Sequence, residues 1–166
     1  MDDQDDDLGA RAPEPDDVVR LCRALNEAGA RYLLIGGFAV VAHGAGRFTK
    51  DVDLLVDDAP ENVARVKRGL SVLPDNAAAQ VADDEVQRHV VVRVADEIGG
   101  GPDACGLSYA EAAQDAEVLE RSGVRIPVAS PATLIRTKDT RRPQDALDRA
   151  FLEGVLRERA RRGGKA

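Results

Sequence analysis

Residues 32–56 read YLLIGGFAVVAHGAGRFTKDVDLLV, and this stretch decides the fold. Its first four residues form a β-prone apolar run, which predicts a buried strand. The run ends at Gly36-Gly37, where glycine permits tight backbone geometry and lets a ligand approach the main chain closely. A short helix is expected over 38–42, and a helix that starts after a glycine turn favours bound phosphate through its first N–H groups.

Two aspartates follow a basic loop and open a second predicted strand. Side chains alternate along a strand, so Asp51 and Asp53 share one face while Val52 points to the other. Their Cα atoms would be about 7 Å apart, which lets both carboxylates converge on one ion. Mg²⁺ prefers one or two protein carboxylates together with phosphate oxygens and water. The glycine pair and the carboxylate pair together predict a metal–nucleotide site.

This combination resembles the signature of the DNA polymerase β-like nucleotidyltransferase superfamily. Gly36-Gly37, thirteen residues and Asp51-Val52-Asp53 follow one another in the order of that signature. The sequence of residues 36–56, GGFAVVAHGAGRFTKDVDLLV, is most similar to that of the bacterial AbiEii-type branch, which includes toxins of toxin–antitoxin systems. A lone Asp-x-Asp is more often a solvated strand end, and a lone Gly-Gly is more often a simple turn. The ordered combination is much more specific, and it implies the nucleotidyltransferase fold.

The predicted fold class is α/β, with a small mixed β-sheet flanked by helices and a C-terminal helical segment from about residue 130. A length of 166 residues suits one domain, which we place at 16–166 behind a disordered acidic tail at 1–15. Hydrophobic spacing and turn signals predict the remaining elements. Beyond the opening stretch, helices are expected over 16–28, 60–70, 109–116, 131–138 and from 143, and strands over 89–94 and 124–128. Ser130 is the expected N-cap of the helix at 131–138, and Ser122-Gly123 is the expected turn before the strand at 124–128. The helix from 143 is expected to pack through Leu147, Phe151 and Val155, which are spaced four apart.

A second motif lies in the C-terminal part of the chain. The segment PATLIRTK at 131–138, followed by RRPQD at 141–145, resembles the family's helix with a lysine, Arg/Pro-rich turn and aspartate-bearing helix. The resemblance implies that Lys138 holds a triphosphate as a point charge and that Asp145 orients Lys138 or an arginine. The plain alternative is a salt bridge between Lys138 and Asp145, which is worth little if exposed. Asp148 is as suited to pair with a neighbouring arginine as to join the site.

The chain departs from the family pattern at the third carboxylate, which relatives carry on a neighbouring strand. An apolar strand with an aspartate is expected between 98 and 104, where this chain reads GGGPD at 99–103. Three glycines and a proline predict a poor strand. Asp96 continues the even-numbered face of the valine-rich run at 90–94 and is the first candidate for the third acid. Because a missing ligand would weaken the second metal of a two-metal site, a degenerate domain that binds nucleotide or a protein partner is the alternative function.

The resemblance implies a Mg²⁺-dependent (or Mn²⁺-dependent) enzyme that moves a nucleoside monophosphate from an NTP to an acceptor hydroxyl. The acceptor stays open, because relatives use tRNA ends, proteins and small molecules, and an antitoxin protein is an expected partner of a toxin. The catalytic candidates are Asp51, Asp53 and Asp96, with the first two also as metal ligands, and the nucleotide-binding candidates are Gly36, Gly37, Arg47, Thr49, Lys138 and Asp145.

Charge is unevenly distributed along the chain. The net charge is −7, residues 1–17 alone carry −7, and the chain from Arg136 onward carries +5. The acidic run is typical of a disordered tail, whereas the basic end favours phosphate or RNA as a partner. The plain interpretation of the basic run at 157–165 is a solvated helix end.

Composition also excludes several classes of protein. No apolar run reaches the length of a membrane span, and the acidic N-terminus does not fit a secretory signal. Cys22 and Cys105 lack metal-motif spacing and are too few for a disulfide framework, which favours a reduced, cytoplasmic protein. Cys22 lies in the apolar stripe of the first helix and is expected in the core, and His89 is expected to be structural.

Overall fold

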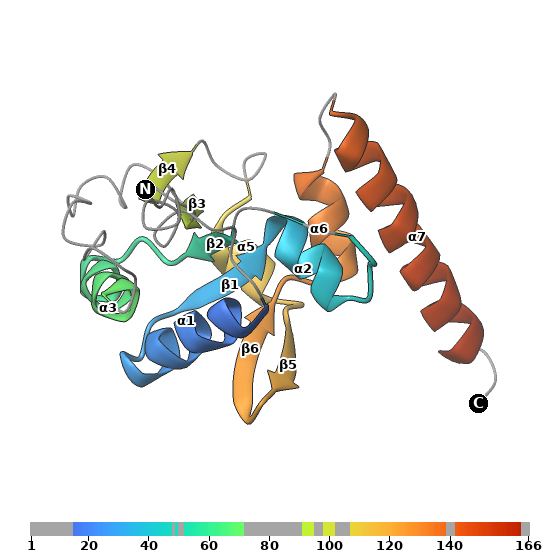
Figure 1. The fold of residues 1–166 in the computed structure, drawn as a ribbon. Helices are drawn as coiled ribbons and strands as arrows, with labels where there is room; N and C mark the ends of the chain where they lie inside the picture. The colour runs from blue at the N-terminus through green and yellow to red at the C-terminus, as the bar shows by residue number, and fades with distance from the viewer. Residues whose placement is uncertain are drawn as a thin grey trace, which may run out of the picture.

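The computed structural model describes residues 15–47, 49, 52–71, 91–94, 98–101, 107–138 and 142–163, and these form an α/β architecture (Figure 1). Its mixed sheet is flanked by helices and followed by a long C-terminal helix, as predicted. The elements are α1 (Pro15–Glu27), β1 (Tyr32–Ile35), α2 (Gly36–Ala42), β2 (Val52–Val56), α3 (Pro60–Leu70), β3 (Val91–Val94), β4 (Ile98–Gly101), α5 (Tyr109–Ala113), β5 (Glu117–Arg121), β6 (Val124–Val128), α6 (Pro131–Thr137) and α7 (Pro143–Gly163).

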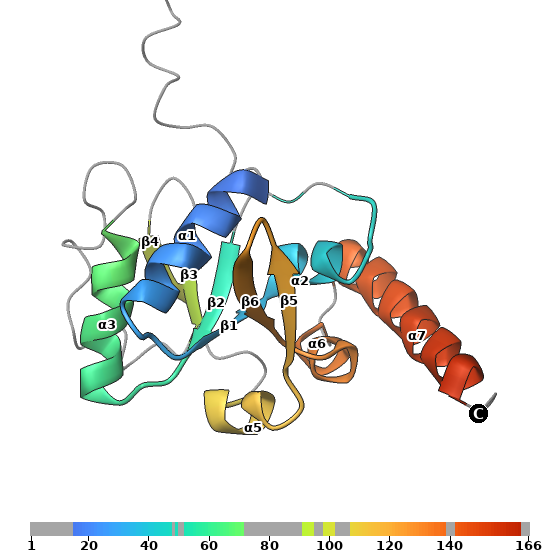
Figure 2. The same cartoon turned by 90° about the horizontal axis from the view of Figure 1, so that it is seen from below.

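The sheet is the middle layer of the molecule. Its strand order is β4-β3-β2-β1-β6-β5, with β1 and β6 parallel and every other neighbouring pair antiparallel. Figure 2 shows α1 over one face of the sheet and α5 and α6 over the other. Because both faces are covered, the central strands β1 and β2 are almost continuously apolar and buried.

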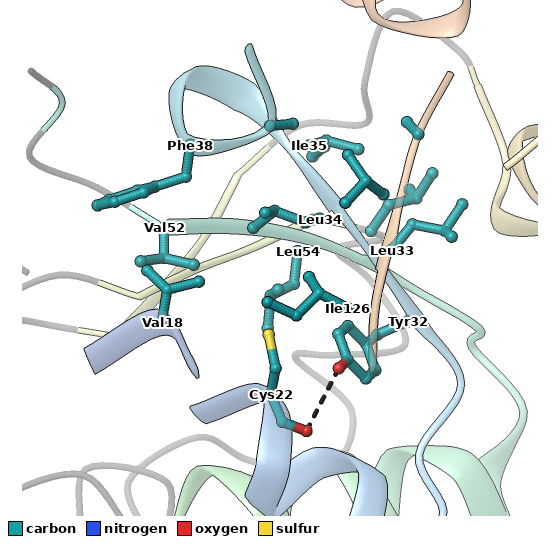
Figure 3. Packing of buried hydrophobic residues seen from close by; sticks show 14 of the residues in the cluster. Val18, Cys22, Tyr32, Leu33, Leu34, Ile35, Phe38, Val52, Leu54 and Ile126 are labelled. Atoms are coloured by element: carbon teal, nitrogen blue, oxygen red, sulfur yellow. Dashed lines mark hydrogen bonds between the residues drawn. The ribbon is translucent and has the colours of Figure 1, made fainter. Parts of the chain in front are cut away.

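The core between α1 and the sheet contains Cys22, as predicted from its place in the apolar stripe. Figure 3 shows Leu54 and Ile126 pointing towards Cys22, whose side chain is fully buried. Burial raises the pKa of the Cys22 thiol to about 11, despite an opposing contribution from a hydrogen bond with Tyr32. The Tyr32 hydroxyl also donates to the Cys22 carbonyl oxygen at 3.3 Å. Cys22 is therefore an inert core residue.

Local sequence signals fix several element boundaries where they were predicted. Ser130 caps α6, since its Oγ accepts a hydrogen bond from the Thr133 N–H at 3.0 Å, and Pro131 occupies the first helical position. The hairpin between β5 and β6 turns at Ser122-Gly123, both with positive φ (53° and 77°), as a tight two-residue turn requires.

The prediction that the glycine-rich stretch from Gly99 forms a poor strand was wrong. Residues Ile98–Gly101 form β4, which pairs antiparallel with β3 in a register that sets Ile98 opposite Val94. Strand pairing needs only the backbone N–H and C=O groups, and glycine has both. The strand lies at the end of the sheet order, where weak strands are best tolerated.

The packing face of α7 also differs from the expectation. The predicted stripe of Leu147, Phe151 and Val155 was wrong at Leu147, whose exposed fraction is 66%. The helix instead turns Asp145, Asp148 and Leu152 inward. These three residues lie on one face of the helix. Asp145 pairs with Lys138 and Asp148 pairs with Arg47, and these ion pairs fix which face of α7 is buried.

The helices α1 and α3 approach each other closely at Gly69. A Cβ at this position would lie 2.6 Å from Leu25 Cδ2 and 2.9 Å from Leu25 Cα. We therefore expect Gly69→Ala to lower the free energy of unfolding by about 1–3 kcal/mol through overpacking. Gly154→Ala on α7 is the matched control, because its Cβ would meet Arg157 Nη2 only at 3.7 Å. That control should gain about 0.5–1 kcal/mol from helix propensity. Urea unfolding measures both, and equal effects would contradict the close packing.

In the part of the chain that the structure describes, no helix combines the length and apolar character that crossing a membrane requires.

Candidate functional site

The site begins where β1 ends and α2 starts. The helix α2 includes the glycine pair in its first turn, two residues earlier than predicted. Ile35 is the register partner of Asp53 on β2, so the Asp53 side chain lies beside the start of α2. Gly36 has a φ of +71°, and a Cβ on it would overlap the Asp53 carboxylate, with Oδ2 as the nearest atom. Only glycine therefore allows Asp53 to pack directly against this turn.

Gly37 has the same relation to the basic loop that follows α2. A Cβ on Gly37 would lie 2.5 Å from Thr49 Oγ1 and 2.9 Å from Arg47 Nη2. The loop thus folds back over the first turn of α2. The side chains of Asp53, Thr49 and Arg47 therefore lie beside the Cα atoms of the two glycines. A ligand at this turn would meet Asp53, Thr49 and Arg47 as well as the main chain.

A buried charge cluster joins this loop to α6 and α7. We define the charge cluster as Arg47, Lys138, Asp145 and Asp148. Arg47 Nη2 lies 2.8 Å from Asp148 Oδ2, and Lys138 Nζ lies 3.1 Å from the same oxygen. Lys138 Nζ also lies 3.4 Å from Asp145 Oδ1. The salt bridge between Lys138 and Asp145 is therefore present, but it is buried, unlike the exposed alternative considered from the sequence.

Asp148 is the centre of the charge cluster. Its side chain is only 2% exposed, and Gln144 Nε2 donates to its second oxygen, Oδ1, at 3.1 Å. Burial alone would raise the pKa of Asp148, but the hydrogen bonds from Arg47, Gln144 and Lys138 outweigh it and lower the pKa below its ordinary value. Asp148 is therefore a carboxylate at neutral pH. Its negative charge holds both cations that the sequence predicts for phosphate contacts.

From the sequence, Asp148 was as suited to pair with a neighbouring arginine as to join the site. Its main arginine partner is Arg47, which is 101 residues away along the chain. The available signal was the spacing of Asp145 and Asp148, which lie three residues apart on one face of a helix. That spacing indicates a shared environment, but it does not identify the distant cation.

Two of the predicted acids lie outside the described residues. These are Asp51, the partner of Asp53 in the expected carboxylate pair, and Asp96, the candidate third acid. His89 and Cys105 also lie outside. The other predicted site residues lie close together, at the glycine turn, in the basic loop and in the charge cluster. They are Gly36, Gly37, Arg47, Thr49, Asp53, Lys138 and Asp145.

The strands β2 and β3 pair antiparallel. Asp53 is opposite Arg93, and Val52 is opposite Val94. Asp96 follows β3 in the sequence and lies outside the described residues, so its role as the third acid stays a prediction.

The donor chemistry at Asp53 fits a hard cation. Asp53 is half-buried at the glycine turn, and Mg²⁺ takes one or two protein carboxylates with the remaining positions filled by phosphate oxygens and water. Among the residues that the structure describes, no three His, Cys, Asp or Glu side chains gather as a metal-binding group. Asp53 can therefore supply one carboxylate ligand to such a cation.

Comparison of the chain with protein-family models gives no match. Comparison with curated protein sequences likewise gives no match.

Proposed function

We propose that this chain is a Mg²⁺-dependent nucleotidyltransferase with the fold of the DNA polymerase β-like superfamily. One observation carries the proposal: the Asp53 carboxylate packs against Gly36 while Thr49 and Arg47 pack against Gly37. These residues were each singled out from the sequence for phosphate or metal binding. Their convergence on a single helical turn supports a shared role at one nucleotide site.

In the proposed reaction the acceptor hydroxyl oxygen forms a bond to the α-phosphorus of the NTP. The α–β phosphoanhydride bond breaks, pyrophosphate leaves, and the hydroxyl proton passes to solvent. Asp53 and Asp51 would hold the Mg²⁺, which neutralises triphosphate charge and polarises the phosphoryl oxygen. Asp148 keeps the guanidinium of Arg47 and the ammonium of Lys138 in fixed positions, so their positive charge is organised before the substrate binds.

The proposal includes an RNA acceptor such as tRNA. The last turns of α7 expose several arginines, and phosphate contacts from such residues supply most non-specific affinity for RNA. Some of this charge is already balanced, since Arg159 pairs with Glu117 and Arg162 with Glu158. The resemblance to the AbiEii-type branch extends the proposal to a cytoplasmic toxin that is neutralised by an antitoxin protein.

Replacing Asp53 by asparagine tests the proposal directly. Wild-type protein with Mg²⁺, labelled NTPs and total tRNA should incorporate label, and Asp53→Asn should reduce the rate by on the order of 10²-fold, because one charge that organises the transition state is lost. Asp58→Asn is the matched control, since Asp58 is an exposed acid just after β2, and it should retain the wild-type rate. An Asp53→Asn variant as active as the control would overturn the assignment.

A second candidate is a nucleotide-binding domain that does not catalyse transfer. The sequence supports it, because GGGP stands at 99–102, where the resemblance implies a strand that carries the third carboxylate. This candidate predicts that the wild type binds Mg²⁺–NTP in calorimetry without incorporating label into any acceptor. Binding should then weaken in Asp53→Asn and stay unchanged in Asp58→Asn.

A further inference from the structure

In the described part of the chain, the hairpin strand β5 forms one edge of the sheet. It is the last strand in the sheet order, and its residues alternate between half-buried and exposed until the exposed end of the strand. Val118 on this strand is 54% exposed, which is unusual for a large apolar side chain in the described chain. An edge strand with an exposed apolar residue is a template for pairing with another strand.

The hairpin geometry shows which backbone groups face outward. In a two-residue hairpin the residues flanking the turn form a hydrogen-bonded pair, here Arg121 and Val124. Because hydrogen-bonded and non-hydrogen-bonded pairs alternate, the N–H and C=O groups of Val118 and Glu120 point away from β6 towards the open edge. Among the described residues, no backbone hydrogen bond outside the helices and strands involves these two residues.

The two ends of β5, EVLER, are complementary in charge when the strand pairs antiparallel with a copy of itself, because Glu117 is acidic and Arg121 is basic. A two-fold axis at Leu119 sets Val118 opposite Glu120 of a second copy, so the outward backbone groups of the two strands bond each other. The same axis sets Glu117 opposite Arg121 in both directions, which gives two ion pairs. Arg121 has no ion-pair partner within the described part of the chain, whereas Glu117 is oriented by Arg159 at 2.9 Å. A carboxylate can accept further donors in that arrangement.

An apolar cavity of about 230 Å³ lies beside the same edge. Leu119 and Ile126 line it from the hairpin, and Leu34, Phe38 and Val41 line it from β1 and α2. Pairing about Leu119 would place a second apolar side chain beside Leu119 at this border. The edge therefore combines open backbone groups, self-complementary charge and apolar surface.

We propose that two copies of this chain associate through β5 as a two-fold symmetric dimer with one continuous sheet. The interface is isologous, because the same strand contributes from each copy. A second copy is the occupant we propose, since Glu117 and Arg121 at the two ends of EVLER pair with each other across the two-fold axis. The proposal does not depend on the chemistry at Asp53.

Sedimentation velocity over a range of protein concentrations tests the dimer. The wild type should shift from monomer towards dimer as concentration rises. Val118→Pro removes an outward N–H and no hydrogen bond within the hairpin, and Arg121→Glu sets like charges opposite each other. Each should raise the dissociation constant at least about tenfold, because two symmetric contacts are lost at once. Arg20→Glu, the same charge change on an exposed residue of α1, should leave it unchanged.

Circular dichroism and thermal unfolding identify variants that remain folded, and Arg121→Glu at the exposed end of β5 keeps the test valid if Val118→Pro does not fold. A wild type that stays monomeric at every concentration would overturn the proposal. So would a dimer whose dissociation constant is unaffected by Arg121→Glu. Either result would leave β5 open to other strands, and the proposal of self-pairing would be wrong.

Discussion

Replacing Asp148 by alanine should lower the free energy of unfolding by about 3–5 kcal/mol, because the change leaves two partly buried cations without their shared carboxylate. Arg47 and Lys138 have side chains that are only 22% and 11% exposed, so water replaces the lost charge poorly. The proposed transferase activity should also fall, since both cations would move from their fixed positions. Chemical denaturation and the labelled-NTP assay measure the two effects.

Glu153→Ala is the matched control for this prediction. Glu153 is an exposed acid on the same helix, and its removal should change stability by no more than about 0.5 kcal/mol. If the two variants unfold at the same denaturant concentration, the charge cluster does not stabilise the fold. A folded Asp148→Ala protein with full activity would separate the cluster from the nucleotide site.

The stabilisation by Asp148 should depend on pH in a defined direction. Its pKa in the folded protein is lowered from the ordinary value of 3.8 despite burial, because Arg47, Gln144 and Lys138 donate to it. The contribution is therefore fully present above about pH 4 and is lost as pH falls through the folded pKa. Asp148→Asn keeps the shape and removes this titration. The difference in unfolding free energy between wild type and Asp148→Asn should stay constant from about pH 7 to about pH 4 and shrink as the pH falls further.

Gly36→Ala should lower both the stability of the protein and the rate of the proposed transfer reaction. The left-handed backbone at Gly36 costs alanine about 1–2 kcal/mol, and the new Cβ would overlap the Asp53 carboxylate. We expect a loss of at least about 2 kcal/mol in unfolding free energy and a fall in transferase rate of at least about tenfold, because Asp53 must move.

Gly46→Ala provides the comparison for Gly36→Ala. Gly46 lies in the basic loop after α2, its φ is outside the left-handed region, and a Cβ there would have nothing within 4 Å. It should therefore retain the stability and rate of the wild type. A Gly36→Ala protein with wild-type rate would mean that the position of Asp53 is not important for the chemistry.

The sequence predicted best those features that depend on local signals. The apolar run of β1, the cap at Ser130 and the turn at Ser122-Gly123 each follow from residues within a few positions of one another, and each was confirmed. The order of the site residues along the chain was also sufficient to predict that Gly36 and Asp53 would meet. That prediction succeeded because one strand, one short helix and one loop connect them.

Features that depend on distant partners could not be predicted in this way. The rotation of α7 is set by ion pairs to Lys138 and Arg47, so apolar spacing alone misplaced Leu147 on the buried side. The strand β4 forms through backbone pairing with β3, and its glycines give no side-chain pattern to read. The sequence does not show which side chains lie beside Gly36 and Gly37. The fold shows that these are Asp53, Thr49 and Arg47.

The distance along the chain between Arg47 and Asp148 has a consequence for biosynthesis. A ribosome synthesises the N-terminal part of a protein first. Arg47 and Asp148 are 101 residues apart, so the loop that carries Arg47 is made long before α7. Until α7 has been synthesised, the nascent polypeptide carries this guanidinium without the Asp148 carboxylate that pairs with it in the folded structure. The proposed activity would therefore arise only after α7 has been made and has docked.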